Sequence, residues 1–355
     1  MKTFNTKRTL WTFVILLLVA VTVIISAVTT VADGTQKPVI YIHDGAIDEY
    51  VSYLLLSTMD GVDLQGLIIV NADCIDTPAM DAQWKFQQFT GQTDVPLALS
   101  RARGWNPFPW SFRAQCIEQK NVKFLEDYKP SPVYPSGEKL LRKVLTEAVE
   151  ADRPVTLLVN CPLTPLYLVL SQNPELEEGI DKLVWMGGAI DVKGNLGSPP
   201  VVPKQVANEK AEWNVFWDPS STEWIFENTS FPIVEFPLDI TNKAQITEKF
   251  LSRLKEQGKN FTYSELAYES YSIITSLTKA NQSSYEMWDV LTTTYLARPD
   301  IYTQYSKEYL SVVTAGKLQG ALKKDPDGRE VKVMFDFDRE EYYEYVLEQF
   351  KAGSK

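Results

Sequence analysis

Short runs of aliphatic and β-branched residues alternate with longer amphipathic stretches from Lys37 onward. Six runs predict strands at residues 38–43, 64–70, 95–100, 154–159, 182–186 and 231–236. Helices are predicted between them at residues 48–59, 77–89, 136–151 and from 163, and a late pair of strands near 309–315 and 330–337 is expected at the edge. Strands separated by helices favour an α/β fold with an open, mostly parallel central sheet, a Rossmann-like core, flanked by helices on both faces.

Polar or glycine residues follow four of these predicted strands, namely Asp44, residues 71–73, Asn160 and residues 187–188. Ligands of open parallel sheets bind at the carboxyl ends of the strands, so these residues should converge on one rim. Asp44, Asp48 and Glu49 place three carboxylates within six residues, which repel one another unless a cation, a basic neighbour or water separates them. An acidic, asparagine-rich rim suits a hard cation and a polyhydroxylated ligand.

Composition indicates a globular protein, since 45% of the 355 residues are hydrophobic. That length allows one large α/β domain or two ordinary ones, and no repeat or linker divides residues 37–355, so we treat them as one domain. The 46 acidic residues outnumber the 35 basic residues and give a net charge of −11. A negative net charge repels the phosphate backbone of a nucleic acid, so nucleic acid is excluded as a partner.

Residues 1–36 form a separate N-terminal segment in this interpretation. Residues 9–32 carry no charge, follow Lys2, Lys7 and Arg8, and are long enough to cross a bilayer as an apolar helix. The segment is either a cleaved signal peptide or an uncleaved signal anchor, which we favour because the apolar run exceeds a usual signal core. Either alternative places the rest of the chain outside the cytosol, secreted or periplasmic in the first case and membrane-anchored in the second.

Three cysteines, Cys74, Cys116 and Cys161, are the only ones in the chain. An odd number in an oxidising compartment allows at most one internal bridge. Their spacing does not match a motif in which cysteines ligate a metal ion, so we interpret them as buried thiols. Three tripeptides beginning at Asn228, Asn260 and Asn281 fit N-glycosylation, although such tripeptides also arise by chance.

Seven segments resemble, in the same order, motifs of the nucleoside hydrolase family, in particular its inosine-uridine preferring members. They are DGAIDE (44–49), GLIIVNAD (66–73), LLVNCPLTPL (157–166), VWMGGAI (184–190), ANEKAEWNVFWDP (207–219), PLDITNKAQIT (237–247) and MWDVLTTTYLARPDIY (287–302). The resemblance implies hydrolysis of the N-glycosidic bond of a ribonucleoside to free base and ribose. It also implies a homo-oligomer, because family members commonly assemble as dimers or tetramers.

The resemblance further implies a calcium ion at the rim, held by Asp44, Glu49, Asp289 and the main-chain oxygen of Asn160. Asp44 would also act as the general base that takes a proton from the attacking water. The substrate-binding groups carried over are Asp48, Asp73, Asn208, Glu212 and Asn214, with Asn195 as a rival for the role of Asn208. Considered alone, Asp48 and Glu49 would be read as acids that complement a helix dipole.

Aromatic residues are the candidates for holding the nucleobase. Some family members protonate the base with a histidine, and that position is Trp288 here. Other members stack the base on tryptophan, so Trp288 with Trp105 or Trp110 could sandwich a purine. Trp288 is otherwise a core aromatic, whereas Trp105 and Trp110 lie in a long loop rich in aromatic residues and prolines.

The chain departs from the family pattern at Ile42, Gly45, Ala46, Glu49, Asp73 and Asn160. The first hypothesis is a calcium-dependent nucleosidase. The alternative is a catalytically impaired homologue that binds nucleosides or ribose on the same fold. A third hypothesis makes Asp44 the nucleophile of a phosphotransfer enzyme, and it ranks last because that motif needs an acid where the chain has Ala46.

Overall fold

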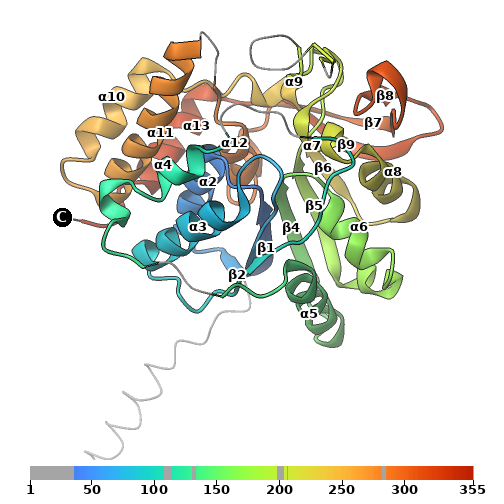
Figure 1. Cartoon of the computed structure of the whole chain (residues 1–355), viewed down its shortest axis with the longest axis horizontal. Coiled ribbons are helices and arrows are strands. Elements are labelled where there is room, and N and C mark those ends of the chain that lie inside the picture. The colour runs from blue at the N-terminus through green and yellow to red at the C-terminus, as the bar shows by residue number, and fades with distance from the viewer. Residues whose placement is uncertain are drawn as a thin grey trace, which may run out of the picture. The chain divides into compact units, whose positions relative to one another are not determined.

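The described strands form one sheet in the order β3-β2-β1-β4-β5-β6-β9-β7-β8 (Figure 1). The structure is a computed structural model that describes residues 36–107, 113–129, 133–197, 204–205, 207–281 and 285–354, without the side chains of residues 276–281. The strands are β1 (Lys37–His43), β2 (Val62–Ile69), β3 (Leu97–Leu99), β4 (Val155–Asn160), β5 (Ile180–Met186), β6 (Ile233–Phe236), β7 (Gln304–Val312), β8 (Leu322–Lys324) and β9 (Arg329–Asp336). All neighbours from β3 to β9 are parallel, whereas β7 runs antiparallel to β9 and β8.

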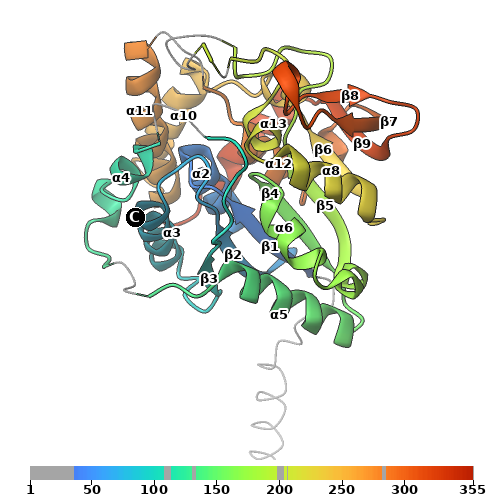
Figure 2. The same ribbon diagram turned by 45° about the vertical axis from the view of Figure 1, so that its right-hand side comes forward.

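Helices cover both faces of this sheet (Figures 1 and 2). The α-helices are α2 (Ile47–Leu56), α3 (Asp76–Thr90), α4 (Gln115–Gln119), α5 (Gly137–Glu150), α6 (Thr164–Leu170), α7 (Trp213–Trp217), α8 (Pro219–Asn228), α9 (Leu238–Thr241), α10 (Glu248–Gln257), α11 (Thr262–Asn281), α12 (Trp288–Thr294) and α13 (Arg339–Gln349). The described residues also form the 3₁₀ turns η1 (Lys123–Leu125), η2 (Pro174–Gly179), η3 (Pro299–Ile301) and η4 (Gly316–Leu318). The predicted fold class is therefore confirmed, with helix and strand ends shifted by a few residues from the prediction.

The two faces of the sheet have separate hydrophobic cores. In β1, Val39 and Tyr41 join the core under α2, α3, α10, α11, α12 and α13, whereas Ile40 and Ile42 join the core under α5, α6, α7 and α8. Successive side chains of a strand point to opposite faces, and a parallel sheet covered on both sides needs apolar residues on both. This is why β1 reads as a continuous apolar run, and Ile42 belongs to one of these cores.

Residues 37–355 form one compact unit. The apolar segment 9–32, for which a signal or anchor helix is predicted, lies outside the described residues. Among the helices that the structure describes, none is long and apolar enough to span a bilayer.

Candidate active site

Gly45 turns the chain sharply between β1 and α2 and so aims the acids that follow. Its φ is +83°, in the left-handed region, and an added Cβ would lie 2.7 Å from the Cβ of Ala79. Proline fixes φ near about −65° and cannot adopt this conformation. The family proline is therefore incompatible with the path that the backbone takes here, and the turn buries Asp44, Asp48 and Glu49 at the rim.

Asp44 is held by the loop that follows β2. Its Oδ2 accepts a hydrogen bond of 3.0 Å from the main-chain N–H of Asp73, and its carbonyl accepts one of 3.0 Å from Cys74. Its own N–H donates to Glu49 Oε1 at 3.3 Å. The carboxyl ends of β1 and β2 are thus joined around Asp44, as the sheet topology predicts.

Asp48 acts as a cap on a distant helix. The N–H groups of Asp289 and Val290, at the start of α12, donate to its Oδ2 at 2.7 and 3.1 Å, and Tyr271 donates to its Oδ1 at 2.6 Å. Free N–H groups at a helix start need such acceptors. Burial raises the pKa of Asp48 to about 7, against these hydrogen bonds. The ribose contact predicted for Asp48 must share oxygens that already accept bonds from the protein.

Asn160 lies at the end of β4, where it connects β1 to α12. Its Nδ2 donates to the hydroxyl of Tyr41 at 3.2 Å and to the carbonyl of Asp289 at 3.5 Å. Ser52 also donates to that carbonyl at 3.4 Å. The Oδ1 of Asn160 is buried without a hydrogen-bond partner in the described structure. These contacts bring Asp289, from a segment late in the chain, to the rim that Asp44 and Asn160 form.

The acids at this rim are buried close to one another, which disfavours their charged forms. Burial raises the pKa of Asp44, Glu49 and Asp289, and each also lies within repulsive range of other acids of the cluster. No ion pair among the described residues includes any of these three. Buried carboxylates without a positive partner are neutralised by protons or by a bound cation.

The donor set fits a hard metal ion in its chemistry. All of its groups are carboxylate, amide or carbonyl oxygens, and Glu49 Oε2 is buried without a hydrogen-bond partner. Hard cations such as Ca²⁺ take oxygen ligands. In the described part of the chain, however, no three His, Cys, Asp or Glu side chains are grouped so that they could hold an ion as they stand.

Glu212 and Asn214 lie at the same rim, beyond β5. Glu212 Oε2 accepts from the N–H groups of Gly188 and Asn214, both at 2.9 Å, and so caps α7. Asn214 Nδ2 donates to the carbonyl of Met186 at 3.0 Å. Burial raises the pKa of Glu212 to about 7, and the nearby negative charge of Asp44 adds to this. Glu212 and Asn214, two of the residues predicted to bind ribose hydroxyls, are thus fixed to the end of β5.

Asn208 and Asn195 make different contacts. Asn208 Nδ2 donates to the carbonyl of Gln319 at 2.8 Å, which ties it to the segment after η4. Asn195 Oδ1 accepts from the N–H of Trp213 at 3.1 Å. The side chain of Asn195 therefore contacts the segment that carries Glu212 and Asn214, whereas the side chain of Asn208 contacts Gln319 and the N–H of Lys210.

The three candidate tryptophans have separate surroundings. Trp288 donates its indole N–H to Asn242 at 2.9 Å and meets the ring of Tyr285 edge to face at 4.6 Å. Trp105 is 75% exposed on the loop after β3. Trp110 lies outside the described residues. His43, the only histidine, is buried against Tyr41, and burial lowers its pKa to about 3.

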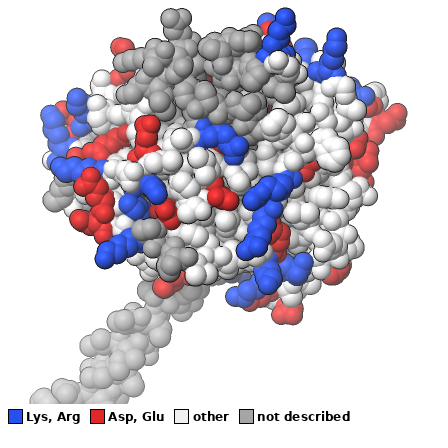
Figure 3. Space-filling view, viewed as in Figure 1, with Lys and Arg blue, Asp and Glu red and all other residues white. Residues whose placement is uncertain are grey.

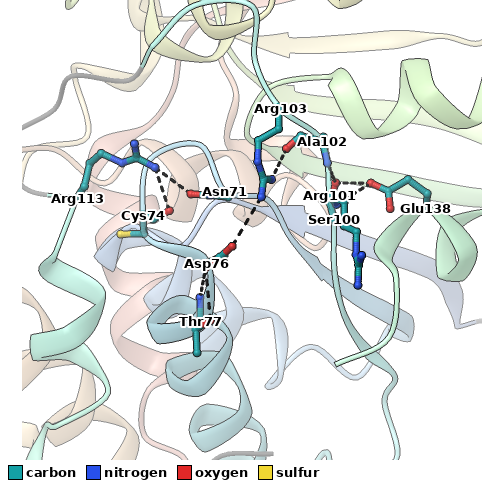
Figure 4. A network of polar contacts seen from close by, with 10 residues as sticks. All are labelled: Asn71, Cys74, Asp76, Thr77, Ser100, Arg101, Ala102, Arg103, Arg113 and Glu138. Carbon is teal, nitrogen blue, oxygen red and sulfur yellow. Dashed lines mark hydrogen bonds and ion pairs between the residues drawn. The ribbon is translucent and has the colours of Figure 1, made fainter. Parts of the chain in front are cut away.

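Arg113 is a rim residue that the sequence did not single out. It donates to the carbonyl of Asp73 at 2.9 Å from the chain that leads into α4. It also donates to Asn71 Oδ1 at 2.9 Å (Figure 4). Its positive charge opposes the effect of burial on the pKa of Asp44 and Asp73. Asp73 stands where the family has asparagine, so Arg113 compensates the added negative charge. Its place at the end of the aromatic loop was the one available signal.

Comparison with known proteins agrees with this architecture. The family model for inosine-uridine preferring nucleoside hydrolases matches residues 39–344, and the chain belongs to that family. The non-specific ribonucleoside hydrolase RihC of Escherichia coli O9:H4 is 29% identical over 228 residues, which cover 62% of this chain and 68% of that protein.

Solved structures agree in fold. An inosine-uridine preferring nucleoside hydrolase from Bacillus anthracis superimposes with a TM-score of 0.79 at 29% identity, covering 89% of this chain and 99% of its own. A plant nucleoside hydrolase gives a TM-score of 0.74 at 20% identity over 89% of this chain and 99% of its own, which supports the fold alone. The predicted family is thus confirmed.

Proposed function

We propose that this chain hydrolyses the N-glycosidic bond of ribonucleosides with Asp44 as general base and a calcium ion at the rim. The observation that carries the proposal is the burial of Asp44, Glu49 and Asp289 together at the carboxyl edge of the sheet, in a member of this family. A cluster of acids with perturbed pKa values in such a place is typical of a functional site.

The ion would be held by Asp44, Glu49, Asp289 and the main-chain oxygen of Asn160. When bound, it supplies positive charge that orients ribose hydroxyls and a water and makes that water more acidic. Calcium is favoured over magnesium because a flexible set of oxygen ligands with a longer glutamate arm suits its larger and less regular shell.

Each residue then has a definite task. Asp44 takes the proton of the attacking water, and the N–H of Asp73 holds its carboxylate in place. Glu212 and Asn214 would form hydrogen bonds with ribose hydroxyls. They would use side-chain oxygen and nitrogen atoms that are not already occupied by the hydrogen bonds within the protein. Asp48 fixes the start of α12, and therefore Asp289, while its remaining lone pairs would face the sugar.

The nucleobase would meet aromatic surface. Trp288 packs on Met186, Ala189 and Leu238, next to the end of β5, and would present a ring to the base. Stacking of a base on an aromatic ring is worth about 1–3 kcal/mol in nucleic-acid binders. Trp105 is the exposed candidate for the opposite side.

A second candidate, a binding protein of the same fold without turnover, is favoured by two observations. The Asp48 carboxylate is engaged by three protein donors, and the acids are not arranged as ready metal ligands among the described residues. Such a protein would bind nucleosides or ribose through Glu212 and Asn214 and release no base.

The localisation is also part of the proposal. Residues 9–32 would direct the chain into the secretory pathway, with the folded unit facing the lumen or the outside, and the chain would assemble with copies of itself. Digestion of intact cells with an external protease tests on which side of the membrane the folded unit lies. The mass of the mature protein, denatured and native, tests whether residues 9–32 are removed and whether copies of the chain assemble.

The deciding experiment is a nucleoside panel assayed with and without a calcium chelator. We expect inosine, uridine or both to release free base, the chelator to stop the release, and added Ca²⁺ to restore it. Binding of a nucleoside without base release under every metal condition would assign the second candidate instead.

A further inference from the structure

Two of the three cysteines lie side by side beneath the rim. Cys74 belongs to the loop after β2, Cys116 belongs to α4, and both are fully buried. The two thiols are near enough for each to shift the pKa of the other. Cys116 Sγ is also 3.8 Å from the carbonyl oxygen of Ile75, the neighbour of Cys74. Figure 4 shows the Cys74 sulfur pointing toward the chain that runs from Arg113 into α4.

The third cysteine is placed differently. Cys161 follows β4, and its thiol donates to the carbonyl of Pro162 at 3.5 Å. It belongs to the core on the opposite face of the sheet from Cys74 and Cys116. Cys161 could bridge to either of the other two only with backbone movement, which leaves Cys74 and Cys116 as the candidate pair.

We propose that Cys74 and Cys116 are a redox site and form an intramolecular disulfide that fastens α4 to the rim loop. All three cysteines are thiols in this structure. Closing the bridge removes one hydrogen from each thiol and joins the two sulfurs. The two electrons and two protons pass to a disulfide-containing oxidant, such as glutathione disulfide, which is reduced to two thiols.

The order of the exchange follows from the contact between the thiols. The Cys74 thiol lowers the pKa of Cys116, whereas burial raises the pKa of Cys74, so we assign the first attack on the oxidant to Cys116. A mixed disulfide on Cys116 is then attacked by Cys74, whose sulfur is already adjacent. Both steps need a transient opening of α4, because neither sulfur is exposed.

The bridge would act on the groups that hold Asp44. Cys74 donates its N–H to the carbonyl of Asp44 at 3.0 Å, and Arg113 donates to the carbonyl of Cys74 at 3.5 Å. On the α4 side, Gln115 donates to Asp73 Oδ2 at 3.3 Å. A covalent link between the two segments fixes Arg113 and Gln115 against Asp73, whereas the reduced form leaves them held by hydrogen bonds alone.

Thiol mapping tests the proposal without any assay of activity. The full-length protein is equilibrated with glutathione disulfide, acid-quenched, unfolded and alkylated, and its peptides are identified by mass spectrometry without reduction. We expect a Cys74–Cys116 peptide pair and alkylation at Cys161 only. Three alkylated cysteines, or a bridge that includes Cys161, would overturn the proposal.

Thermal unfolding of oxidised and reduced protein gives the second readout. Closing a long loop restricts the unfolded chain, so oxidation should raise the midpoint temperature of the wild type. The matched variant Cys161→Ser should keep this rise, and Cys116→Ser should lose it. A rise that persists in Cys116→Ser would contradict the assignment, and peptide mapping of the wild type decides the matter if that variant does not fold.

Discussion

Acidic residues are treated differently at the surface and at the rim of the sheet. On the surface several are paired: Arg298 contacts Asp300 and Glu341, and Arg253 contacts Glu344. Figure 3 shows charges of both signs intermixed over one face. At the rim, Asp44, Glu49 and Asp289 are buried together, and the described residues offer them no ion pair.

This difference indicates that the buried acids at the rim need a source of positive charge. Uncompensated buried charge is costly, and the folded state retains it when a ligand or catalysis uses it. Arg113 supplies part of the compensation through Asn71 and the backbone of Asp73, but it forms no ion pair with the acids within the described structure. The remaining positive charge must come from protons or from a cation.

The largest expected effect is on turnover. Asp44→Asn removes the proposed base, and kcat/KM for the best nucleoside should fall by about 10²–10⁴-fold, because that is what a general base contributes. Chromatography of the released base measures it, and circular dichroism verifies the fold. The surface variant Asp300→Asn should have the wild-type rate. An Asp44→Asn protein with undiminished turnover would remove Asp44 from the mechanism.

The second effect is a change with pH in the free energy of unfolding, measured in the presence of a metal chelator. The folded-state pKa of Glu212 is raised to about 7 from 4.5, so the folded protein binds a proton more tightly than the unfolded chain does. The stability that this proton contributes is fully present below about pH 4.5 and is lost as the pH rises through about 7. Glu212→Gln should abolish this loss, which is on the order of 3 kcal/mol. Gln retains an oxygen to accept from Gly188 and Asn214.

Urea unfolding on either side of that window measures the effect. The wild type should lose more stability than Glu212→Gln as the pH rises, and Glu344→Gln at the surface should follow the wild type. Equal losses in wild type and Glu212→Gln would show that Glu212 titrates as an ordinary glutamate.

The third effect separates two buried tyrosines. Tyr271 donates to Asp48, whereas the hydroxyl of Tyr342 is buried without a hydrogen-bond partner in the described structure. Tyr271→Phe should lower the free energy of unfolding by about 1–3 kcal/mol, because it leaves a buried carboxylate oxygen with one donor fewer. Tyr342→Phe should be near neutral. Equal costs in denaturant titrations would argue against a special role for the Asp48 cap.

The smallest effect belongs to the surface pairs. Glu344→Gln breaks the contact with Arg253, in which both side chains are substantially exposed. The expected loss in unfolding free energy is under about 1 kcal/mol, because solvent screens such pairs. A loss as large as that of Tyr271→Phe would erase the distinction between surface and rim.

The sequence predicts the sheet and the convergence at its rim. Alternation of strands and helices places Asp44, Asp73, Asn160 and Gly188 at carboxyl ends of parallel strands, and the contacts of Asp44 with Asp73 and of Glu212 with Gly188 show the convergence. These inferences succeed because strand direction and period are local properties of the chain.

The partners of the acids could not be predicted in the same way. Tyr271 meets Asp48 across 223 positions, and Arg113 reaches Asp73 across 40. Neither pair follows a helical or strand period, because tertiary packing alone brings them together. The positive φ of Gly45 could be suspected from the residue type, but the close approach of Ala79 to an added Cβ depends on where α3 lies.

Calcium binding measured by calorimetry on metal-free protein shows whether the acids at 44, 49 and 289 share one ion. The account predicts about one ion per chain for the wild type and for Asp300→Asn, and affinity weakened by at least about tenfold in Asp289→Asn, which keeps the shape and removes one charged ligand. Calcium affinity in Asp289→Asn equal to that of the wild type would contradict it, because the acids at 44, 49 and 289 would then not share one ion.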